Sequence, residues 1–374
     1  MLLAPGQSGI LHRVRARSSG WIGVDIGAGA VKLAQLERRA NHWHLAQTAL
    51  VPLPEPGQLT RETISAGRLA ALVRQALTSC GRFRGRQAAC VLSPAAVELL
   101  TLEVPSAPDE DLRDMIRQEL AVHHEGADDF EFDYWSAVPA VATSDQGTVA
   151  LNVLAVRRDL AEQTGAEVYA AGLACHELDG TPFALARAVS LAAGDAPPSG
   201  AVAILDWGHS SAMFTVIAGG QPIFARALRN CGCAGMTANV AGTLNLSEQE
   251  ACHLLSTCGV PSDTVHNAAQ RELQEFIAEL VHGPIEEILC ELNKTLAFLK
   301  HQSSELTPGM IWLAGGGATV RNIGQHLEAG LGVSVQNWRP MPHGSEFDFA
   351  GDSLTLPVEM FAGAAALSLL GAIS

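Results

Sequence analysis

The sequence has few charged and few aromatic residues for its length. Of its 374 residues, 17% are charged, 5% are aromatic and 2 are tyrosines. Hydrophobic residues make up 48%, so the chain can bury a sizeable core, and we expect little disorder over most of its length. Basic residues are scarcer than acidic ones, 24 against 39, which gives a net charge of −15. This charge disfavours binding to a bare phosphate backbone, so we predict no nucleic-acid partner.

Long hydrophobic runs are also absent. The longest, FAGAAALSLLGAI at 361–373, is well short of the ~20 residues that a membrane-spanning helix needs. The first residues, MLLAPGQSGILHRVRAR, lack the long apolar segment of a secretory signal. We therefore expect a cytoplasmic protein in which residues 1–20 form a flexible tail. Arg13, Arg15 and Arg17 are interpreted as solvated, with weak attraction to an anionic membrane surface as the alternative.

Several motifs of enzymes and metalloproteins are missing. No Walker A sequence is present, and the dinucleotide fingerprint fails because Lys32 stands where its third glycine would be. No Ser-His-Asp or Cys-His arrangement typical of nucleophilic catalysis is recognisable. The 8 cysteines do not indicate a disulfide scaffold. We expect no zinc, because the spacing fits it poorly at Cys231, Cys233, Cys252 and Cys258.

One short motif occurs twice. GVDIGAGAVKL at 23–33 and AILDWGHSSAMFTVI at 203–217 each read as a strand ending in Asp-x-Gly, a turn of small residues and a second strand. Such a turn presents backbone amides to phosphate oxygens, and its aspartate can orient the waters around Mg²⁺. Two turns facing each other across a cleft would hold a polyphosphate from both sides. The glycines at 315–317 are expected at a helix N-terminus, where they would take the nucleoside or α-phosphate end.

The remaining pattern predicts an α/β protein. Short strands are expected within 21–54 and 86–105, and the apolar positions of 65–80 predict an amphipathic helix. Residues 106–174 read as helix, strand, strand and helix, which we interpret as a small inserted subdomain. The stretch GDAPPSG marks a joint between domains, because proline and glycine cannot continue a helix.

These motifs, in this order, resemble the actin-like ATPase superfamily. Within it the sequence resembles the PilM family of type IV pilus assembly proteins, relatives of the cell-division protein FtsA. IGVDIGAGAVKLAQLE and AILDWGHSSAMFTVI look like the first and second phosphate motifs, and IWLAGGGATVRNIGQHLEAGLGVSV looks like the adenosine motif. PDEDLRDMIRQELAVHH and LNVLAVRRDLAEQTGAEVYAAGL resemble the start and end of the subdomain that PilM shares with FtsA. The resemblance covers 21–371.

The resemblance implies a ribonuclease H-like, duplicated actin-like fold of two domains. We expect the first domain at 21–105, 175–198 and 357–374, and the inserted subdomain at 106–174. The second domain is expected at 199–356, with a helical subdomain at about 247–308.

The implied function is that of a cytoplasmic scaffold in a type IV pilus or type II secretion-like assembly complex, peripheral to the inner membrane through its partners. The implied partner is the cytoplasmic N-terminal peptide of a single-span, PilN-like inner-membrane protein. We expect the peptide in a groove between the first domain and the inserted subdomain, near ELAVHHEGADDFEFDYW. Phe130, Phe132, Tyr134 and Trp135 are interpreted either as part of this groove or as one buried strand face.

The resemblance also implies ATP with Mg²⁺ as a structural or switching ligand. Asp25 and Asp206 are expected to hold Mg²⁺ through water. No residue is recognisable as a general base, so we expect at most a slow ATPase. The residues expected to bind the nucleotide are Asp25, Gly27, Ala28, Gly29, Lys32, Asp206, Gly208, His209, Ser210, Gly232, Gly315, Gly316 and Gly317.

Some positions depart from the family pattern. Ala28 and Gly29 offer only backbone where the family often has a hydroxyl, and His209 is bulkier than usual. The nucleoside-contacting Glu and Lys of the family align with Cys252 and Leu255, which would weaken nucleotide affinity. A nucleotide-free adaptor therefore stays an alternative, as do an FtsA-like division protein and a small-molecule kinase of the same superfamily.

Overall fold

The computed structural model describes residues 19–39, 42–56, 67–80, 82–123, 129–136, 147–194, 198–262, 267–340 and 356–373. The arginines of the N-terminal tail and part of the stretch expected near the groove, 124–128, lie outside the described residues.

The first domain is built on a mixed five-stranded sheet. Its strands are β1 (Ile22–Ile26), β2 (Ala30–Arg39), β3 (His42–Pro52), β4 (Gln87–Leu92) and β8 (Ala174–Asp179), in the order β3-β2-β1-β4-β8. β1 runs antiparallel to β2 and parallel to β4. The predicted amphipathic helix is confirmed as α2 (Arg68–Cys80), which buries Leu69, Val73 and Ala76 beside β2 and β3.

The second domain repeats this sheet. Its strands are β9 (Val202–Trp207), β10 (Ser211–Ala218), β11 (Gln221–Arg229), β12 (Met310–Ala314) and β13 (Ser334–Asn337), in the order β11-β10-β9-β12-β13. β9 runs antiparallel to β10 and parallel to β12, as β1 does with β2 and β4. The duplication read from two short motifs therefore extends to the strand order and strand directions of whole sheets.

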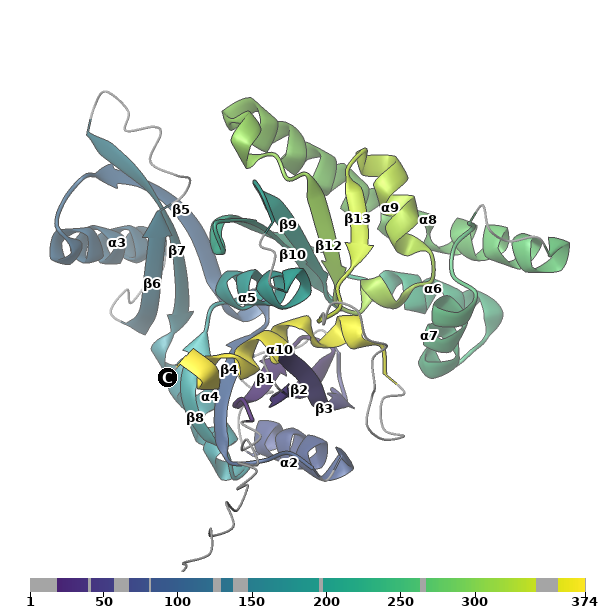
Figure 1. Ribbon diagram of the computed structural model, residues 1–374, viewed down its shortest axis with the longest axis horizontal. Coiled ribbons are helices and arrows are strands. Elements are labelled where there is room, and N and C mark those ends of the chain that lie inside the picture. The colour runs from purple at the N-terminus through teal and green to yellow at the C-terminus, as the bar shows by residue number, and fades with distance from the viewer. Residues whose placement is uncertain are drawn as a thin grey trace, which may run out of the picture.

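Two helices lie between the sheets, as Figure 1 shows near its centre. They are α5 (Thr181–Ala193) and α10 (Ala362–Ser368), with η5 (Val358–Phe361) before α10 and α11 (Leu370–Ile373) after it. Their apolar side chains share one buried cluster with residues of both sheets, such as Leu36 and Ile204. A Cβ on Gly23 of β1 would overlap the carbonyl oxygen of Ala364, so α10 packs directly on the strand backbone.

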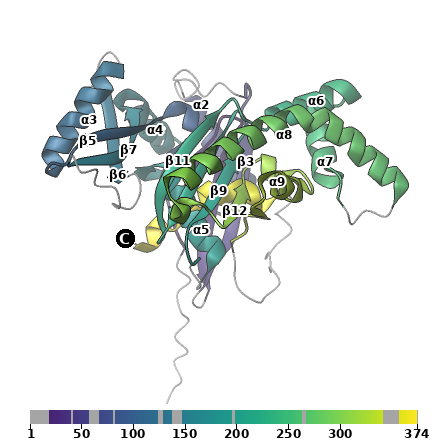
Figure 2. The ribbon, with the colours of Figure 1, turned by 90° about the horizontal axis from the view of Figure 1, so that it is seen from above.

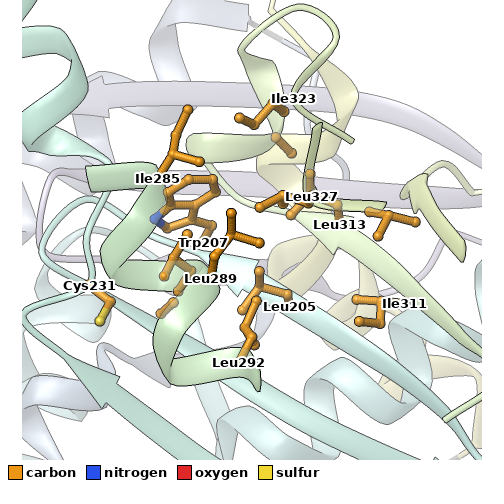
Figure 3. Close-up of a cluster of buried hydrophobic side chains, with 14 of the residues drawn as sticks. Leu205, Trp207, Cys231, Ile285, Leu289, Leu292, Ile311, Leu313, Ile323 and Leu327 are labelled. Atoms are coloured by element: carbon orange, nitrogen blue, oxygen red, sulfur yellow. The ribbon is translucent and has the colours of Figure 1, made fainter. Parts of the chain in front are cut away.

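The second core lies on the other face of the second sheet, under the helices. These are α6 (Ala234–Leu244), α7 (Glu248–Thr257), α8 (Ala268–Gln302) and α9 (Ile323–Leu331), with short η3 (Ser304–Leu306). Figure 3 shows Trp207 and Leu205 of β9 packed among Ile285 and Leu289 of α8. Because α6 packs on α7 and α8, the helical part begins at Ala234 and not at the expected position 247.

A third, three-stranded sheet forms the inserted unit. Its strands are β5 (Glu98–Pro105), β6 (Phe130–Ser136) and β7 (Thr148–Arg157), in the order β5-β7-β6, and η1 (Pro94–Ala96) precedes β5. Helix α3 (Asp109–His123) covers one face. Figures 1 and 2 show this unit at one end of the molecule and α6 and α7 at the other.

Both expected limits of the inserted subdomain need correction. The expected start at 106 leaves β5 in the first domain, but β5 pairs along its whole length with β7. The helix after β7, α4 (Arg158–Ala170), was assigned to the insertion. Its buried residues Leu160 and Val168 instead join the core under α2. The packing therefore places the insertion at 98–157.

The aromatic residues of β6 divide between the two faces of the small sheet. Phe130, Phe132 and Tyr134 pack with α3, as the buried-face interpretation predicts. Trp135 points to the opposite face and meets Phe183 of α5, with ring centroids 4.9 Å apart. Within the described residues, no helix is both long and apolar enough to cross a membrane.

Candidate functional site

An ion pair connects the first Asp-x-Gly turn to the strand that follows it. Asp25 of β1 and Lys32 of β2 are directly opposite in the antiparallel register, so their side chains emerge on the same face. The Lys32 Nζ donates to Asp25 Oδ2 at 3.0 Å, and each side chain keeps 13% of its surface exposed. The pair is therefore largely removed from solvent and little screened.

The second turn brings Asp206 to the same ammonium group. In the second sheet, the residue opposite Asp206 is Met213, so that half supplies no cation of its own. Burial lowers the pKa of Lys32, but attraction to Asp25 and Asp206 outweighs it and leaves this pKa raised. Burial raises the pKa of Asp206, and Lys32 offsets only part of that shift. Two carboxylates thus share one ammonium, with a formal net charge of −1.

The backbone of both turns is fixed by hydrogen bonds. In the first turn, the amide of Gly27 donates to Ala30 at 3.1 Å, and the carbonyl of Gly29 accepts from Leu53 at 3.0 Å. In the second turn, the carbonyl of Gly208 accepts from Cys233 at 2.9 Å, and that of His209 from Ala234 at 3.0 Å. The start of α6 therefore lies on the second turn.

Gly232 allows this close packing on the second turn. A Cβ there would overlap the His209 carbonyl and the backbone of Ser210. Gly232 and Ser210 thus come together in the structure.

The two turns touch each other through one side chain. A Cβ built on Gly29 would lie 2.8 Å from His209 Cβ and Cγ and 3.0 Å from its Nδ1. The imidazole of His209 is half-buried, and burial lowers its pKa despite the opposing influence of Glu248. The space between the two Asp-x-Gly turns is therefore partly taken by this ring.

The third glycine run lies against the end of β9. Gly315 has a φ of +85°, and a Cβ there would be 2.5 Å from Asp206 Oδ1. The amide of Gly315 donates to Glu359 at 2.9 Å, and a Cβ on Gly317 would overlap the Trp207 indole. The expectation that this run opens a helix is wrong in detail. Only the short η4 (Gly317–Thr319) begins there, and α9 starts at Ile323.

At the expected nucleoside end, α7 carries Cys252 and Leu255 at the two positions that align with the family's Glu and Lys. Leu255 is buried in the core, and its carbonyl accepts from the Arg321 amide at 3.0 Å. Cys252 is exposed, with its sulfur 3.6 Å from the Thr237 hydroxyl. A cavity of about 600 Å³ opens beside η4. The polar residues of its lining include Ser256, Thr319, Arg321, Asn337, Arg339 and Glu359.

The donor set at the turns fits magnesium polyphosphate chemically. Mg²⁺ keeps several waters and takes carboxylate oxygens, which Asp25 and Asp206 supply, and Lys32 is a cation suited to phosphate. Among the described residues, no group of three or more His, Cys, Asp or Glu side chains is arranged to hold a metal directly. Any Mg²⁺ here would therefore depend on water and the ligand for most of its coordination.

A second polar feature, missed in the sequence, lies in the small third sheet. Thr101, Asn152 and Trp135 form one row across β5, β7 and β6, on the face away from α3. The Thr101 hydroxyl donates to Asn152 Oδ1 at 3.0 Å. Asn152 Nδ2 and Trp135 Nε1 are buried without a hydrogen-bond partner within the described residues. In the sequence, the sign of this polar row was a single Asn inside the apolar run TVALNVLAV.

Comparisons with known proteins agree with this architecture. The family model described as type IV pilus assembly protein PilM matches residues 23–347. A chain of the PilM-PilN type IV pilus biogenesis complex is 25% identical, with a TM-score of 0.72 over 94% of this chain and 98% of that chain. The ethanolamine utilization protein EutJ from Carboxydothermus hydrogenoformans shares the fold at 15% identity, with a TM-score of 0.54 over 95% of this chain and 90% of that chain. The predicted actin-like fold is confirmed.

Proposed function

Because the chain belongs to the type IV pilus assembly protein PilM family, we propose that it is an actin-like scaffold of a pilus-assembly complex. In this proposal it works in the cytoplasm, on the inner face of the membrane, and a PilN-like single-span protein holds it there. The similar chain in the PilM-PilN complex supports this choice of partner. The net charge of −15 suits a partner with basic residues beside its membrane span.

The junction between the third sheet and α5 is the proposed site for the partner's cytoplasmic peptide. β5 and β6 are the outer strands of that sheet, each paired only with β7 among the described residues. An outer strand offers backbone groups to an extended peptide. The contact between Trp135 and Phe183 closes the junction beside the row of polar residues.

The observation that carries the proposal is the pair of unpartnered donors in this row. A buried donor without a partner costs about 1–3 kcal/mol, so the two on Asn152 and Trp135 make the peptide-free junction costly. Carbonyl oxygens of an extended peptide would satisfy both.

A peptide titration tests the partner site. The probe is a synthetic peptide with the cytoplasmic N-terminal sequence of the organism's own PilN-like protein, followed by fluorescence anisotropy. Trp135→Phe removes the indole N–H and keeps a ring, and Asn152→Leu removes the amide. Each should weaken binding by about 3- to 10-fold, the value of one hydrogen bond.

The matched control for this titration is Arg117→Gln. Arg117 is exposed on α3, on the far face of the sheet, and its substitution should leave the affinity unchanged. Unchanged affinity in Trp135→Phe and Asn152→Leu as well would place the peptide elsewhere.

The finer proposal is that Mg²⁺-ATP binds between the two Asp-x-Gly turns as a structural or switching ligand. Lys32 and the turn backbone would meet phosphate oxygens, and Asp25 and Asp206 would orient the waters of Mg²⁺. Among the described residues, the backbone hydrogen bonds of the first turn use neither the Ala28 nor the Gly29 amide, which leaves both for a ligand.

Isothermal titration with Mg²⁺-ATP tests this ligand. We expect binding by the wild type that falls at least tenfold in Asp206→Ala. Equal affinities, or no binding at millimolar ATP, would favour the nucleotide-free adaptor.

A further inference from the structure

His209 and Gly29 form a complementary pair across the cleft. The φ of Gly29 lies outside the left-handed range, so its backbone conformation would accept an ordinary side chain. What stands in the way is the His209 side chain, whose Cβ and ring carbon Cγ both lie 2.8 Å from the position that a Cβ would take. The large side chain at position 209 therefore fits only because position 29 has no side chain.

The backbone of His209 has little freedom to move away from this contact. Its carbonyl accepts from Ala234, and Gly232 packs directly beneath it. The corresponding residue in the first turn, reading both motifs from Asp-x-Gly, is Ala28, which carries only a methyl group. Rotation of the His209 side chain can therefore move its ring out of this space, while its Cβ stays beside Gly29.

We propose that His209 is a gate on the nucleotide cleft, whose imidazole fills the gap between the two turns and must rotate outward before a polyphosphate enters. The inference rests on the proposed nucleotide function and adds to it the residue that limits affinity. A ligand that needs a minor conformation binds more weakly by the fraction of molecules in that conformation. If the outward rotamer is populated at about one in ten, removal of the ring tightens binding about tenfold.

The ligand experiment compares Mg²⁺-ATP affinity of the wild type, His209→Ala and Asp206→Ala/His209→Ala by isothermal titration. His209→Ala places alanine at position 209, as at the equivalent position of the first turn, Ala28. We expect it to bind about tenfold tighter than the wild type, and the added Asp206→Ala to remove that gain. His253→Ala, an exposed histidine on α7, is the control and should match the wild type.

The packing experiment needs no nucleotide. Gly29→Ala should lower the melting temperature of the wild type through its clash with Cβ and Cγ of His209, and should have much less effect in a His209→Gly background, which lacks both atoms. If Gly29→Ala prevents folding of the wild type, recovery of folding by His209→Gly serves as the same readout. Equal effects in both backgrounds would show that the His209 side chain does not lie against position 29 and would overturn the gate.

The outcomes separate this inference from the function beneath it. Wild type that binds ATP, with His209→Ala equal or weaker, overturns the gate and leaves the nucleotide function standing. No binding by either protein at millimolar ATP overturns both. Tighter binding by His209→Ala, lost with Asp206→Ala, supports both.

Discussion

Replacement of Lys32 by methionine probes the centre of the cleft without any ligand. Methionine keeps the length and apolar stem of lysine, and it is the residue at the equivalent position of the second sheet, Met213. The variant leaves the carboxylates of Asp25 and Asp206 close together with no cation between them. Their mutual repulsion and incomplete hydration should then destabilise the folded protein.

The magnitude follows from the burial of the pair. Removing one partner of a buried ion pair costs 3–5 kcal/mol, and because each side chain keeps 13% of its surface exposed we expect the lower end, about 3 kcal/mol. Urea unfolding followed by circular dichroism measures this loss. Lys294→Met is the control, because Lys294 is exposed and its surface ion pair with Glu291 contributes little.

The loss should depend on pH with a definite sign. In the wild type, burial raises the folded-state pKa of Asp206, so this group lowers stability as pH rises through that value. In Lys32→Met the attraction of Lys32 is lost, so the pKa of Asp206 rises further. The variant's loss of stability therefore continues to higher pH. We expect Lys32→Met to approach the wild type at about pH 4 and to differ most at about pH 8.

The double variant Lys32→Met/Asp206→Asn should recover part of the lost stability at neutral pH, because one charge of the facing pair is gone. Two results would refute the shared-cation arrangement. One is a Lys32→Met protein as stable as Lys294→Met at neutral pH, and the other is a deficit that stays constant from acid to alkaline pH.

Three smaller predictions concern thiols and glycines. Maleimide labelling mapped by mass spectrometry should modify Cys175 before Cys90. Their sulfurs lie 3.5 Å apart, and the hydrogen bond between them lowers the pKa of Cys175 and raises that of Cys90. Equal labelling rates would contradict this. Cys233 should stay unlabelled at neutral pH, since burial raises its pKa to about 12. In thermal melts, Gly23→Ala should be severely destabilised by overlap with α10, whereas Gly165→Ala, with open space in α4, should gain about 0.5–1 kcal/mol.

Local patterns predicted the elements that lie close together in sequence. The Asp-x-Gly motif at Asp25 and the small residues after it predicted β1, the turn and β2, and a hairpin of this length places Lys32 opposite the aspartate. The helical spacing of Leu69 and Val73 predicted α2 for the same reason. In each of these cases the partners in space are within a few residues of each other in the chain.

The limits of the insertion and the state of the cleft depend instead on distant contacts. β5 reads as one more apolar strand, and only its pairing with β7, about fifty residues on, assigns it to the third sheet. α4 is amphipathic in either domain, and the core that accepts Leu160 decides where it belongs. The contact of His209 with Gly29 joins the two domains, so it depends on how they are placed relative to each other. Local sequence patterns do not predict that placement.

The two halves of the fold share one architecture, but their Asp-x-Gly turns carry different side chains. Each half supplies a carboxylate at a strand end, but only the first supplies a cation and only the second a bulky ring. The shared ammonium leaves one negative charge over, which suits a divalent cation that brings phosphate with it. The side chain of His209 lies against Gly29, between the two turns. A symmetric pair of turns would lack both features, so we expect exchanges between the halves, such as His209→Ala or Lys32→Met, to change ligand affinity more than substitutions of exposed residues elsewhere on the sheets.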